Sequence, residues 1–282
     1  MIEHSYTRVT LSLDIIRKIA DGEFAGYHEL GIVKHKIDLH DLITIEESPK
    51  MILECNNPLV PCDSGNICWK AVDIIKNHFG IGKNVRIYLE KNIPVMGGLA
   101  GGSANAATTL QILNKLWNLG LSSSRLMIFG RKLGMDVPFY FSGHTAFDTE
   151  ATGHIEKIDH NQSFTFLLAI PDFGVSTRDA YQQIDYSSIG NHISETSSLI
   201  QALRENNRNA IFPLIHNDFE ISVFSKYPRL AEIKANLLNE GCLAAIMSGS
   251  GSTIIGFARD LSHAKSVQSK IDCKTIIVSS LK

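Results

Sequence analysis

Hydrophobic and polar positions alternate with a period of two in several short stretches and with a helical period in others. Alternation predicts half-buried strands, and apolar residues three and four positions apart predict amphipathic helices. The expected strands cover residues 5–16, 29–54 with a break near Ser48, 84–90, 164–170, 253–258 and 275–278. The expected helices cover residues 66–79, 103–120, 123–134, 177–184, 196–206, 208–225 and 228–239, with one more before the last strand. Because strands and helices mix without strict alternation, the pattern predicts an α+β fold.

The segment between the strand at 84–90 and the next helix is rich in glycine. Residues 94–107 contain four glycines, then Ser103, then a run of small helix-forming residues. Glycine leaves no Cβ in the way of a ligand, and the first turn of a helix presents free N–H groups and the positive end of its dipole. With Ser103 as N-cap and Gly120 as C-cap, this segment predicts an anion site, most commonly for phosphate.

A flexible glycine turn is the alternative interpretation of residues 94–107. No Lys-Ser or Lys-Thr pair follows the last glycine, and the G-x-G-x-x-G spacing fails. Neither standard nucleotide-binding fingerprint is therefore present.

The composition is that of an ordinary soluble globular protein, with 44% hydrophobic and 20% charged residues. A length of 282 residues suits one large domain or two small ones, and we expect a division into residues 1–155 and 156–282. The net charge of −2 offers no general attraction to nucleic acid or anionic membranes. The expected partner is a small molecule, and a homodimer is left open.

The cysteines and the N-terminus bear on the compartment. Five cysteines, an odd number without paired spacing, are expected to be free thiols of a reducing compartment. Cys62 and Cys68 lie further apart than usual zinc pairs, so no metal-binding residues are expected. Glu3 and Asp14 interrupt any signal peptide, and the longest apolar run, residues 164–170, is too short to cross a membrane. These features predict a cytoplasmic protein.

Two further segments could carry chemistry. Asp136 is a single carboxylate in the apolar segment 133–139, where a charged group needs a partner or a function. It could accept a proton from a hydroxyl substrate, or it could simply cap a helix. Residues 246–253 form a second small-residue turn, which is either an anion-binding nest or an ordinary flexible turn.

Aromatic and polar residues mark three other segments. Tyr27 and His28 follow a glycine and could stack on and hydrogen-bond a heterocycle, although a surface pair is the simpler interpretation. Residues 172–178 lead to Tyr181 and predict a helix start capped by Ser176 or Thr177. Residues 216–220 are interpreted as a polar patch within a helix.

Taken together and in their order along the chain, these segments resemble the sequence motifs of the GHMP kinases. Residues 94–107 resemble the phosphate loop of that family, and residues 247–256 resemble its C-terminal glycine motif. The segments at 26–30, 133–139, 173–177 and 217–220 match motifs of members whose substrate carries a cytidine diphosphate. The resemblance implies a two-lobed α+β fold with the active site in the cleft between the lobes. It also implies transfer of the γ-phosphoryl group of ATP to a hydroxyl of a cytidylated methylerythritol or another small alcohol.

The resemblance also implies roles for individual residues. The residues that would bind ATP are Asn66, Pro94, Gly97, Gly98, Gly101, Gly102, Ser103 and Ala104. Asn66 would lie near the adenine, and Mg²⁺ would bridge the phosphates. Catalysis would fall to Asp136 and Arg8. The residues that would bind the substrate are Thr10, Tyr27, His28, Tyr181, Gly249 and Ser250, with Tyr27, His28 and Tyr181 around the cytosine.

The chain departs from the family pattern on the acceptor side. The usual A-K-x-N-L motif is replaced at residues 7–11, where Arg8 stands for the lysine and Thr10 for the asparagine. Arginine keeps the charge but cannot give up its proton. The stretch at 21–25, before Tyr27, is also longer than the pattern. These departures leave two alternatives: a kinase for another small alcohol, or a nucleotide-binding relative with weak or no catalysis.

Overall fold

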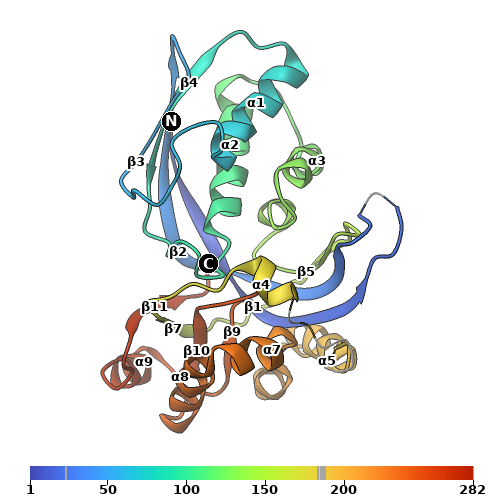
Figure 1. Ribbon diagram of the computed structural model, residues 1–282, viewed down its shortest axis with the longest axis vertical. Coiled ribbons are helices and arrows are strands. Elements are labelled where there is room, and N and C mark those ends of the chain that lie inside the picture. Colours follow the sequence, from blue (N-terminus) through green and yellow to red (C-terminus); the bar gives the residue numbers. More distant parts are fainter. Residues whose placement is uncertain (23, 183, 185–188, 282) are drawn as a thin grey trace. The chain divides into compact units, whose positions relative to one another are not determined.

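The computed structural model describes residues 1–22, 24–182, 184 and 189–281 (Figure 1). The chain forms two compact units. It passes between them repeatedly because the long strands β1 (Ile2–Lys18) and β2 (His28–Ser48) each contribute to both. The first unit contains residues 1–7, 39–95 and 100–143, and the second contains residues 8–38, 96–99 and 144–282.

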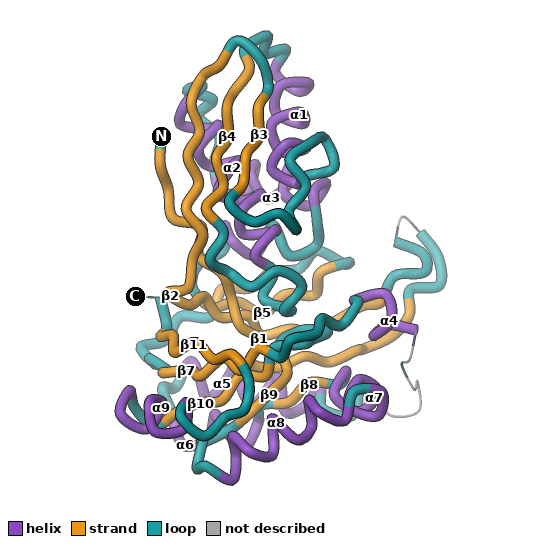
Figure 2. Tube along the Cα trace, turned by 60° about the vertical axis from the view of Figure 1, so that its left-hand side comes forward, coloured by secondary structure: helices purple, strands orange, loops and turns teal. Residues whose placement is uncertain are grey.

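The first unit is a sheet covered by helices. Strand β4 (Asn84–Glu90) pairs antiparallel with β2 and parallel with β3 (Ile52–Cys55). Val85, Ile87 and Leu89 of β4 are buried and the residues between them are exposed, as expected for a strand with one covered face. Three helices pack against one another and lie on one face of this sheet (Figures 1 and 2), namely α1 (Ile67–Phe79), α2 (Gly101–Leu116) and α3 (Ser123–Leu133).

The second unit contains a four-stranded antiparallel sheet in the order β11-β7-β10-β9. Helices α8 (Pro228–Asn239) and α9 (Leu261–Gln268) pack against this sheet (Figure 2). The strands are β7 (Thr165–Ile170), β9 (Ala245–Met247), β10 (Ile254–Ala258) and β11 (Lys274–Ser279). They confirm the strands expected at 164–170, 253–258 and 275–278.

The remaining strands of the second unit belong to the sheet that contains β1 and β2. Strand β5 (Thr145–Glu150) pairs with β2 and with β6 (Ile155–Lys157), and β8 (His216–Asn217) runs parallel to β1. The remaining helical elements are η1 (Pro138–Phe141) in the first unit and α4 (Thr177–Gln182), α5 (Ile193–Arg204), α6 (Arg208–Ile211), η2 (Phe212–Leu214) and α7 (Phe219–Lys226) in the second.

Several expected helix ends are confirmed. Asn66 caps α1, because its Oδ1 accepts a hydrogen bond from the Cys68 backbone N–H at 2.8 Å, and Gly80 ends the helix at φ +66°. Ser176 caps α4 through the Asp179 backbone N–H at 3.4 Å. The helix expected over 177–184 ends at Gln182, and Gln183 lies outside the described residues.

The expected ends of α2 are wrong. Ala100 adopts φ +53° and serves as the N-cap position, so Ser103 lies inside the first turn, without a cap hydrogen bond. At the other end the helix stops at Leu116, because Asn118 turns the chain at φ +50°. Gly120 lies beyond that turn.

The single helix expected over 208–225 is also wrong. Pro213 has no N–H to donate, and the chain there forms the short turns α6 and η2. It then becomes extended to pair with β1, so that Ser12 faces His216 and Leu13 faces Asn217. Residues 216–220 therefore form β8 and the start of α7 rather than a patch within a helix. The polar composition of residues 186–197 predicts a loop, but helix α5 begins at Ile193. Residues 186–188 of that segment lie outside the described residues.

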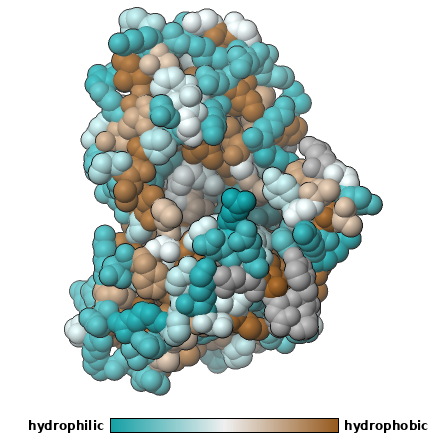
Figure 3. Space-filling view, viewed as in Figure 1, coloured by the Kyte–Doolittle hydropathy of each residue, from teal (hydrophilic) through white to brown (hydrophobic). Residues whose placement is uncertain are grey.

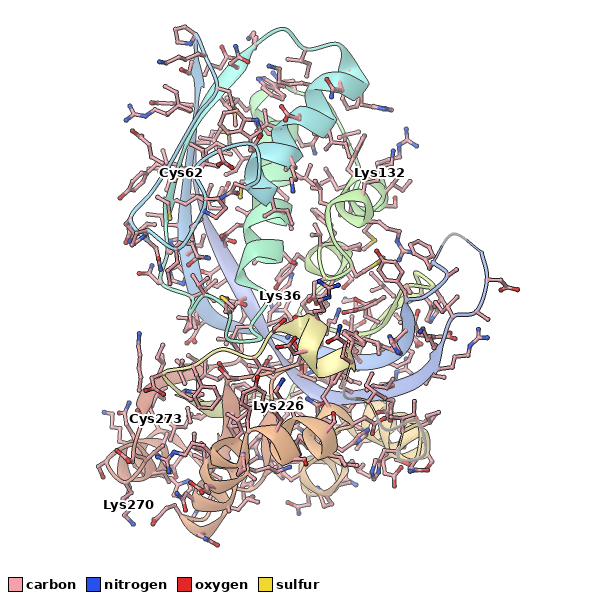
Figure 4. The ribbon with its side chains drawn as sticks, viewed as in Figure 1. Lys36, Cys62, Lys132, Lys226, Lys270 and Cys273 are labelled. Atoms are coloured by element: carbon pink, nitrogen blue, oxygen red, sulfur yellow. The ribbon has the colours of Figure 1, made fainter. Side chains whose placement is uncertain are left out.

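The surface and the cysteines complete this description. On the face shown in Figure 3, hydrophilic and hydrophobic residues are mixed in both units. Within the described residues, no helix has the length and apolarity needed to span a bilayer, and no cluster of three or more metal-ligating side chains occurs. All five cysteines are free thiols, and Cys62 lies in the loop between β3 and α1 (Figure 4).

Candidate active site

The glycine-rich loop has an unusual backbone. Met96 and Ala100 have φ values of +60° and +53°, and Gly98 between them has +74°. Non-glycine residues rarely adopt positive φ, and such conformations persist only where surrounding contacts impose them. The loop thus has a defined backbone conformation with positive φ at three positions.

Gly98 is held against the second small-residue turn. Its carbonyl accepts hydrogen bonds from Ser248 Oγ and from Arg8 Nη1, both at 3.0 Å. A Cβ on Gly98 would lie 2.2 Å from the Ser248 carbonyl oxygen and 2.7 Å from that of Gly251. The Thr253 backbone N–H also donates to the Gly97 carbonyl at 3.3 Å. The two glycine motifs, about 150 residues apart in sequence, are therefore in contact within the second unit.

Arg8 and Thr10 join this contact from β1. The Arg8 side chain is buried, with 5% of the residue exposed, and Nη1 also donates to Thr10 Oγ1 at 3.4 Å. Thr10 Oγ1 in turn accepts a hydrogen bond from the Gly249 backbone N–H at 3.3 Å. Four residues singled out in the sequence, Arg8, Thr10, Gly98 and Gly249, thus form one hydrogen-bonded group that carries the permanent charge of an arginine.

Two residues of the motif at 217–220, to which the sequence analysis gave no role in the site, hold the second turn in place. Asn217 Nδ2 donates to the carbonyls of Met247 and Gly249 at 2.7 and 2.8 Å. Glu220 Oε1 accepts from the Met247 backbone N–H at 2.7 Å, and its Oε2 pairs with Lys234. The available signal was a run of polar residues at 216–220 among apolar neighbours. When such polar side chains are buried, they need hydrogen-bond partners.

The charged neighbours of Asn217 connect the same region to β1. Asp218 Oδ2 accepts from the Ile15 backbone N–H at 2.8 Å, and burial raises the pKa of Asp218. His216 Nε2 lies 3.0 Å from Asp14 Oδ1. Burial lowers the pKa of His216, but hydrogen bonds to Asp14 and to the Leu214 carbonyl outweigh it, so that the pKa is raised. Polar side chains thus fix β8 beside β1.

An aromatic pair lies at the end of α4. The His28 ring stacks on Tyr181, with centroids 4.8 Å apart and planes at 29°, and Tyr181 meets Phe219 edge-on. Burial, followed by the charge of Lys18, lowers the pKa of His28, which favours the neutral ring. Two of the three predicted cytosine residues are together. Tyr27 is 54% exposed and makes an edge contact with Phe24 instead.

Helix α4 is joined to the second turn at its start. Thr177 Oγ1 and Ser250 Oγ are 3.1 Å apart, and Ser252 Oγ donates to the Phe173 carbonyl at 2.7 Å. A cavity of about 290 Å³ opens here, lined among others by Met96, Gly98, Thr177, Arg178, Ser250 and Gly251.

In the first unit, a buried network anchors the start of α2. Asp41 accepts hydrogen bonds from the backbone N–H groups of Asn92 and Ile93 at 2.7 and 2.9 Å and from Asn105 Nδ2 at 2.8 Å, and it pairs with Lys91. A Cβ on Gly101 would lie 2.9 Å from Ile93 Cγ2. Because the neighbouring segment is fixed, the first turn of α2 has a defined position.

Asp136 lies partly buried in the turn between α3 and η1. The N-cap position of η1 is Val137, so Asp136 does not cap that helix, which was the structural alternative. The turn is tightly packed, because a Cβ on Gly130 would lie 2.9 Å from Val137 Cγ1.

Both ends of the Asn66 side-chain amide already make hydrogen bonds. Its Nδ2 donates to the Pro61 carbonyl at 2.7 Å, and its Oδ1 makes the capping bond.

The α+β fold and the paired glycine motifs are those of a small-molecule kinase. Comparison with known families identifies the family. The model of the GHMP kinases N terminal domain matches residues 66–144, and that of the GHMP kinases C terminal region matches residues 199–277. The chain belongs to the GHMP kinase family, whose members use ATP as phosphate donor.

Relatives that match nearly the whole chain share one name. The chain is 38% identical to a 4-diphosphocytidyl-2-C-methyl-D-erythritol kinase of Clostridium botulinum (strain Eklund 17B / Type B), over 97% of this chain and 96% of the relative. It is 38% identical to the enzyme of that name from Gloeobacter violaceus, over 92% and 86% of the two chains.

Solved structures agree in fold. A crystal structure of 4-(cytidine 5'-diphospho)-2C-methyl-D-erythritol kinase matches with a TM-score of 0.82 and 26% identity over the whole of both chains. A homoserine kinase from Cytophaga hutchinsonii matches with a TM-score of 0.73 over 98% of this chain and 94% of that one. At 15% identity, this second match concerns the fold alone.

Proposed function

We propose that this protein transfers the γ-phosphoryl group of ATP to the 2-hydroxyl of 4-diphosphocytidyl-2-C-methyl-D-erythritol, a step in non-mevalonate isoprenoid biosynthesis. The observation that carries the proposal is the hydrogen-bonded group of Arg8, Thr10, Gly98 and Gly249. It joins both glycine motifs of the family to the segment that replaces its usual lysine. The name shared by relatives that match nearly the whole chain supports the choice of acceptor.

The start of α2 suits the phosphates of ATP. The N–H groups of Gly101, Gly102 and Ser103 begin a helix of 16 residues whose first turn contains no acidic residue, and such N–H groups lack partners within the helix. The Ala104 N–H already donates to the Ala100 carbonyl at 3.0 Å, so Ala104 contributes position rather than a donor. Pro94, Gly97 and Asn66 complete the proposed nucleotide site.

Mg²⁺ fits this site as an ion held mainly by the nucleotide. Magnesium prefers oxygen ligands and keeps few protein ligands when phosphates are present. No cluster of three metal-ligating side chains occurs among the described residues, so the phosphates would supply most of the ligands and the Ser103 hydroxyl could join them. The bound ion would neutralise phosphate charge.

Asp136 and Arg8 would act at the acceptor hydroxyl. Phosphoryl transfer requires alignment of the reactants and neutralisation of charge rather than covalent help from the protein. Asp136 would accept the hydroxyl proton, and Arg8 would stabilise the charge of the transferred group without giving up a proton. Thr10, Gly249 and Ser250 would position the alcohol, and His28, Tyr181 and Tyr27 would bind the cytosine.

The test is ADP release from Mg²⁺-ATP with and without the cytidylated substrate. ADP should form above the background ATPase rate only when both substrates are present. Replacing Asp136 with asparagine should lower kcat by ~10²–10⁴-fold, as expected for the loss of a general base, with little change in ATP affinity by calorimetry. Asp73→Asn, at an exposed position of α1, is the matched control. An unchanged kcat for Asp136→Asn would contradict the assigned role.

A second candidate is a kinase for another small alcohol. The observation that favours it is the replacement of the family's lysine by Arg8 and of its asparagine by Thr10. The planar Arg8 guanidinium donates hydrogen bonds to Gly98 and Thr10. A panel of sugars, homoserine and mevalonate-type alcohols separates the two, because turnover of one of these without turnover of the cytidylated substrate would favour this candidate. ATP binding without transfer to any acceptor would indicate a relative with weak or no catalysis.

Three further expectations stay predictions. The division into lobes at 1–155 and 156–282 stays a prediction, since the two family models lie on either side of residue 155 but the two compact units interleave along the chain. A homodimer would be seen by light scattering of the purified chain. A cytoplasmic location would be seen by cell fractionation.

A further inference from the structure

We propose that Arg178, together with the hydroxyls of Thr177 and Ser250, binds the diphosphate of the acceptor substrate. The inference rests on the proposed function, because that function supplies an acceptor in which a diphosphate joins cytidine to the alcohol. All of the residues concerned lie in the second unit.

The first step is the character of the cavity at the start of α4. Thr177 Oγ1 and Ser250 Oγ stand 3.1 Å apart on its wall, and each hydroxyl can still donate or accept toward a ligand. Gly98 and Gly251 also line it, so backbone approaches the space without intervening side chains. None of its described lining residues is acidic. The cavity of about 290 Å³ therefore presents two hydroxyls and the Arg178 side chain to a ligand, and none of its described lining residues would repel an anion.

The second step is the state of Arg178. Among the described residues, the guanidinium of this exposed arginine makes no hydrogen bond or ion pair. Its sequence neighbour Asp179 instead pairs with Lys226 at 3.9 Å, and Lys226 extends from α7 beside α4 in Figure 4. The acidic side chain of α4 thus has its own cation, and Arg178 remains available. A planar guanidinium presents a fork of donors that matches two phosphate oxygens.

The third step is the order of groups along α4. Tyr181 follows Arg178 by three residues, which places both on one side of the helix about one turn apart. Tyr181 carries the stacked His28 ring, the proposed cytosine end. At the opposite end, Gly249 directly precedes Ser250 in the turn. The Gly249 backbone N–H donates a hydrogen bond to Thr10, and Thr10 also accepts one from Arg8.

This order reproduces the order of parts in the acceptor. The aromatic pair corresponds to cytosine, Arg178 with Thr177 and Ser250 to the diphosphate, and Thr10 with Arg8 to the alcohol. The diphosphate is the group between the two ends, and Arg178 precedes Tyr181 on α4 and lines the same cavity as Ser250. Arg178 is accordingly expected to set specificity for a charged linkage rather than to take part in phosphoryl transfer.

The experiment compares the binding of cytidine, CMP and CDP to the full chain by calorimetry and by competition in the ADP-release assay. The variants are Arg178→Ala, Arg178→Lys and Ser250→Ala, with Lys226→Gln as the control that removes a positive charge beside α4. Arg178→Ala should weaken CDP binding by about 10- to 100-fold, the range of one charge-assisted contact, while cytidine binding stays within about twofold. Arg178→Lys should retain part of the CDP affinity, Ser250→Ala should lose several-fold, and Lys226→Gln should change little. Circular dichroism checks that each variant is folded.

The outcomes separate this proposal from the function on which it rests. If Arg178→Ala leaves CDP binding unchanged, or weakens cytidine and CDP equally, Arg178 does not bind the diphosphate, although the kinase function can still stand. If the unmodified protein binds CDP no better than cytidine, there is no diphosphate site. Failure of the unmodified protein to bind either ligand or to phosphorylate the cytidylated substrate would overturn both proposals.

Discussion

Replacing Gly98 with alanine should separate the glycine loop from the turn at 248–252. Real Cβ atoms essentially never approach a non-bonded atom within 3.0 Å, and a Cβ at this position would lie 2.2 Å from the Ser248 carbonyl oxygen and 2.7 Å from that of Gly251. Both obstacles are backbone atoms, which cannot turn aside as a flexible side chain can. The loop and the turn must therefore move apart.

The size of the effect follows from what that movement breaks. Alanine at φ +74° costs about 1–2 kcal/mol relative to glycine. Displacing the Gly98 carbonyl also removes the bond from Ser248 Oγ, worth about 0.5–1.5 kcal/mol, and that from the charged Arg8, worth about 1.5–3 kcal/mol. The total, roughly 3–6 kcal/mol, is a large fraction of the stability of an ordinary domain.

The assay is urea denaturation followed by circular dichroism, together with kcat in the ADP-release assay. Gly98→Ala should lower the free energy of unfolding by roughly 3–6 kcal/mol, because the contact opens and the hydrogen bonds to the Gly98 carbonyl are lost. The same opening displaces Arg8 and the glycine loop, so kcat should also fall, by about 10²-fold, because small misplacements of catalytic groups have such effects. Gly102→Ala is the control for stability, since the nearest atom to its Cβ would be Ile67 Cγ2 at 4.0 Å.

The control also has a defined expectation. Gly102 lies in the first turn of α2, where alanine should leave stability unchanged or raise it by up to about 1 kcal/mol. A Gly98→Ala protein with both full activity and stability within about 1 kcal/mol of the original would refute the reasoning.

Three other predictions concern buried polar groups. Asn217→Asp replaces the amide that donates to two carbonyls with a carboxylate that cannot donate, and should cost about 2–4 kcal/mol in urea denaturation while raising KM for the acceptor more than KM for ATP. Equal changes in both KM values would assign Asn217 no local role. Asp41→Asn should cost about 3–5 kcal/mol because it leaves the buried Lys91 without its anion; the double variant with Lys91→Met should recover part of the loss, and no recovery would exclude the buried charge as the cause. Burial, followed by His160 and His144, lowers the pKa of His35 to about 3, so between pH 6.5 and about 3 the unfolded chain binds a proton that the folded chain does not. Stability should therefore fall below pH 6.5, by about 2–3 kcal/mol at pH 4.5 from this group, and His35→Gln should reduce that fall; an identical pH dependence in the variant would contradict it.

Local patterning was sufficient for the elements whose ends are set by neighbouring residues. The alternation at 84–90 predicted β4 with its bounds. The helical period at 66–79 predicted α1, which Asn66 and Gly80 cap, since capping depends on groups within one turn of the chain. The glycine loop was recognised for the same reason, because its composition is local.

Local patterning failed where a distant partner decides the conformation. Residues 216–217 became a strand because β1 offers free backbone groups beside them, and the hydrogen bonds of Asn217 reach a turn 30 and 32 residues away. The early end of α2 is a different case: Asn118 takes a positive φ, a conformation in which asparagine is enriched, so the local signal was present but Gly120 was predicted as the C-cap instead.

The sequence by itself determined the fold class, most of the elements and the presence of two glycine motifs in a GHMP kinase. Only the tertiary structure showed that Arg8, Thr10, Gly98 and Gly249 share one hydrogen-bonded group, and that Asn217 and Glu220 hold the second turn. The physical reason is that secondary structure follows from contacts between near neighbours in the chain. A binding site, in contrast, depends on the pairing of strands and turns that are far apart in sequence.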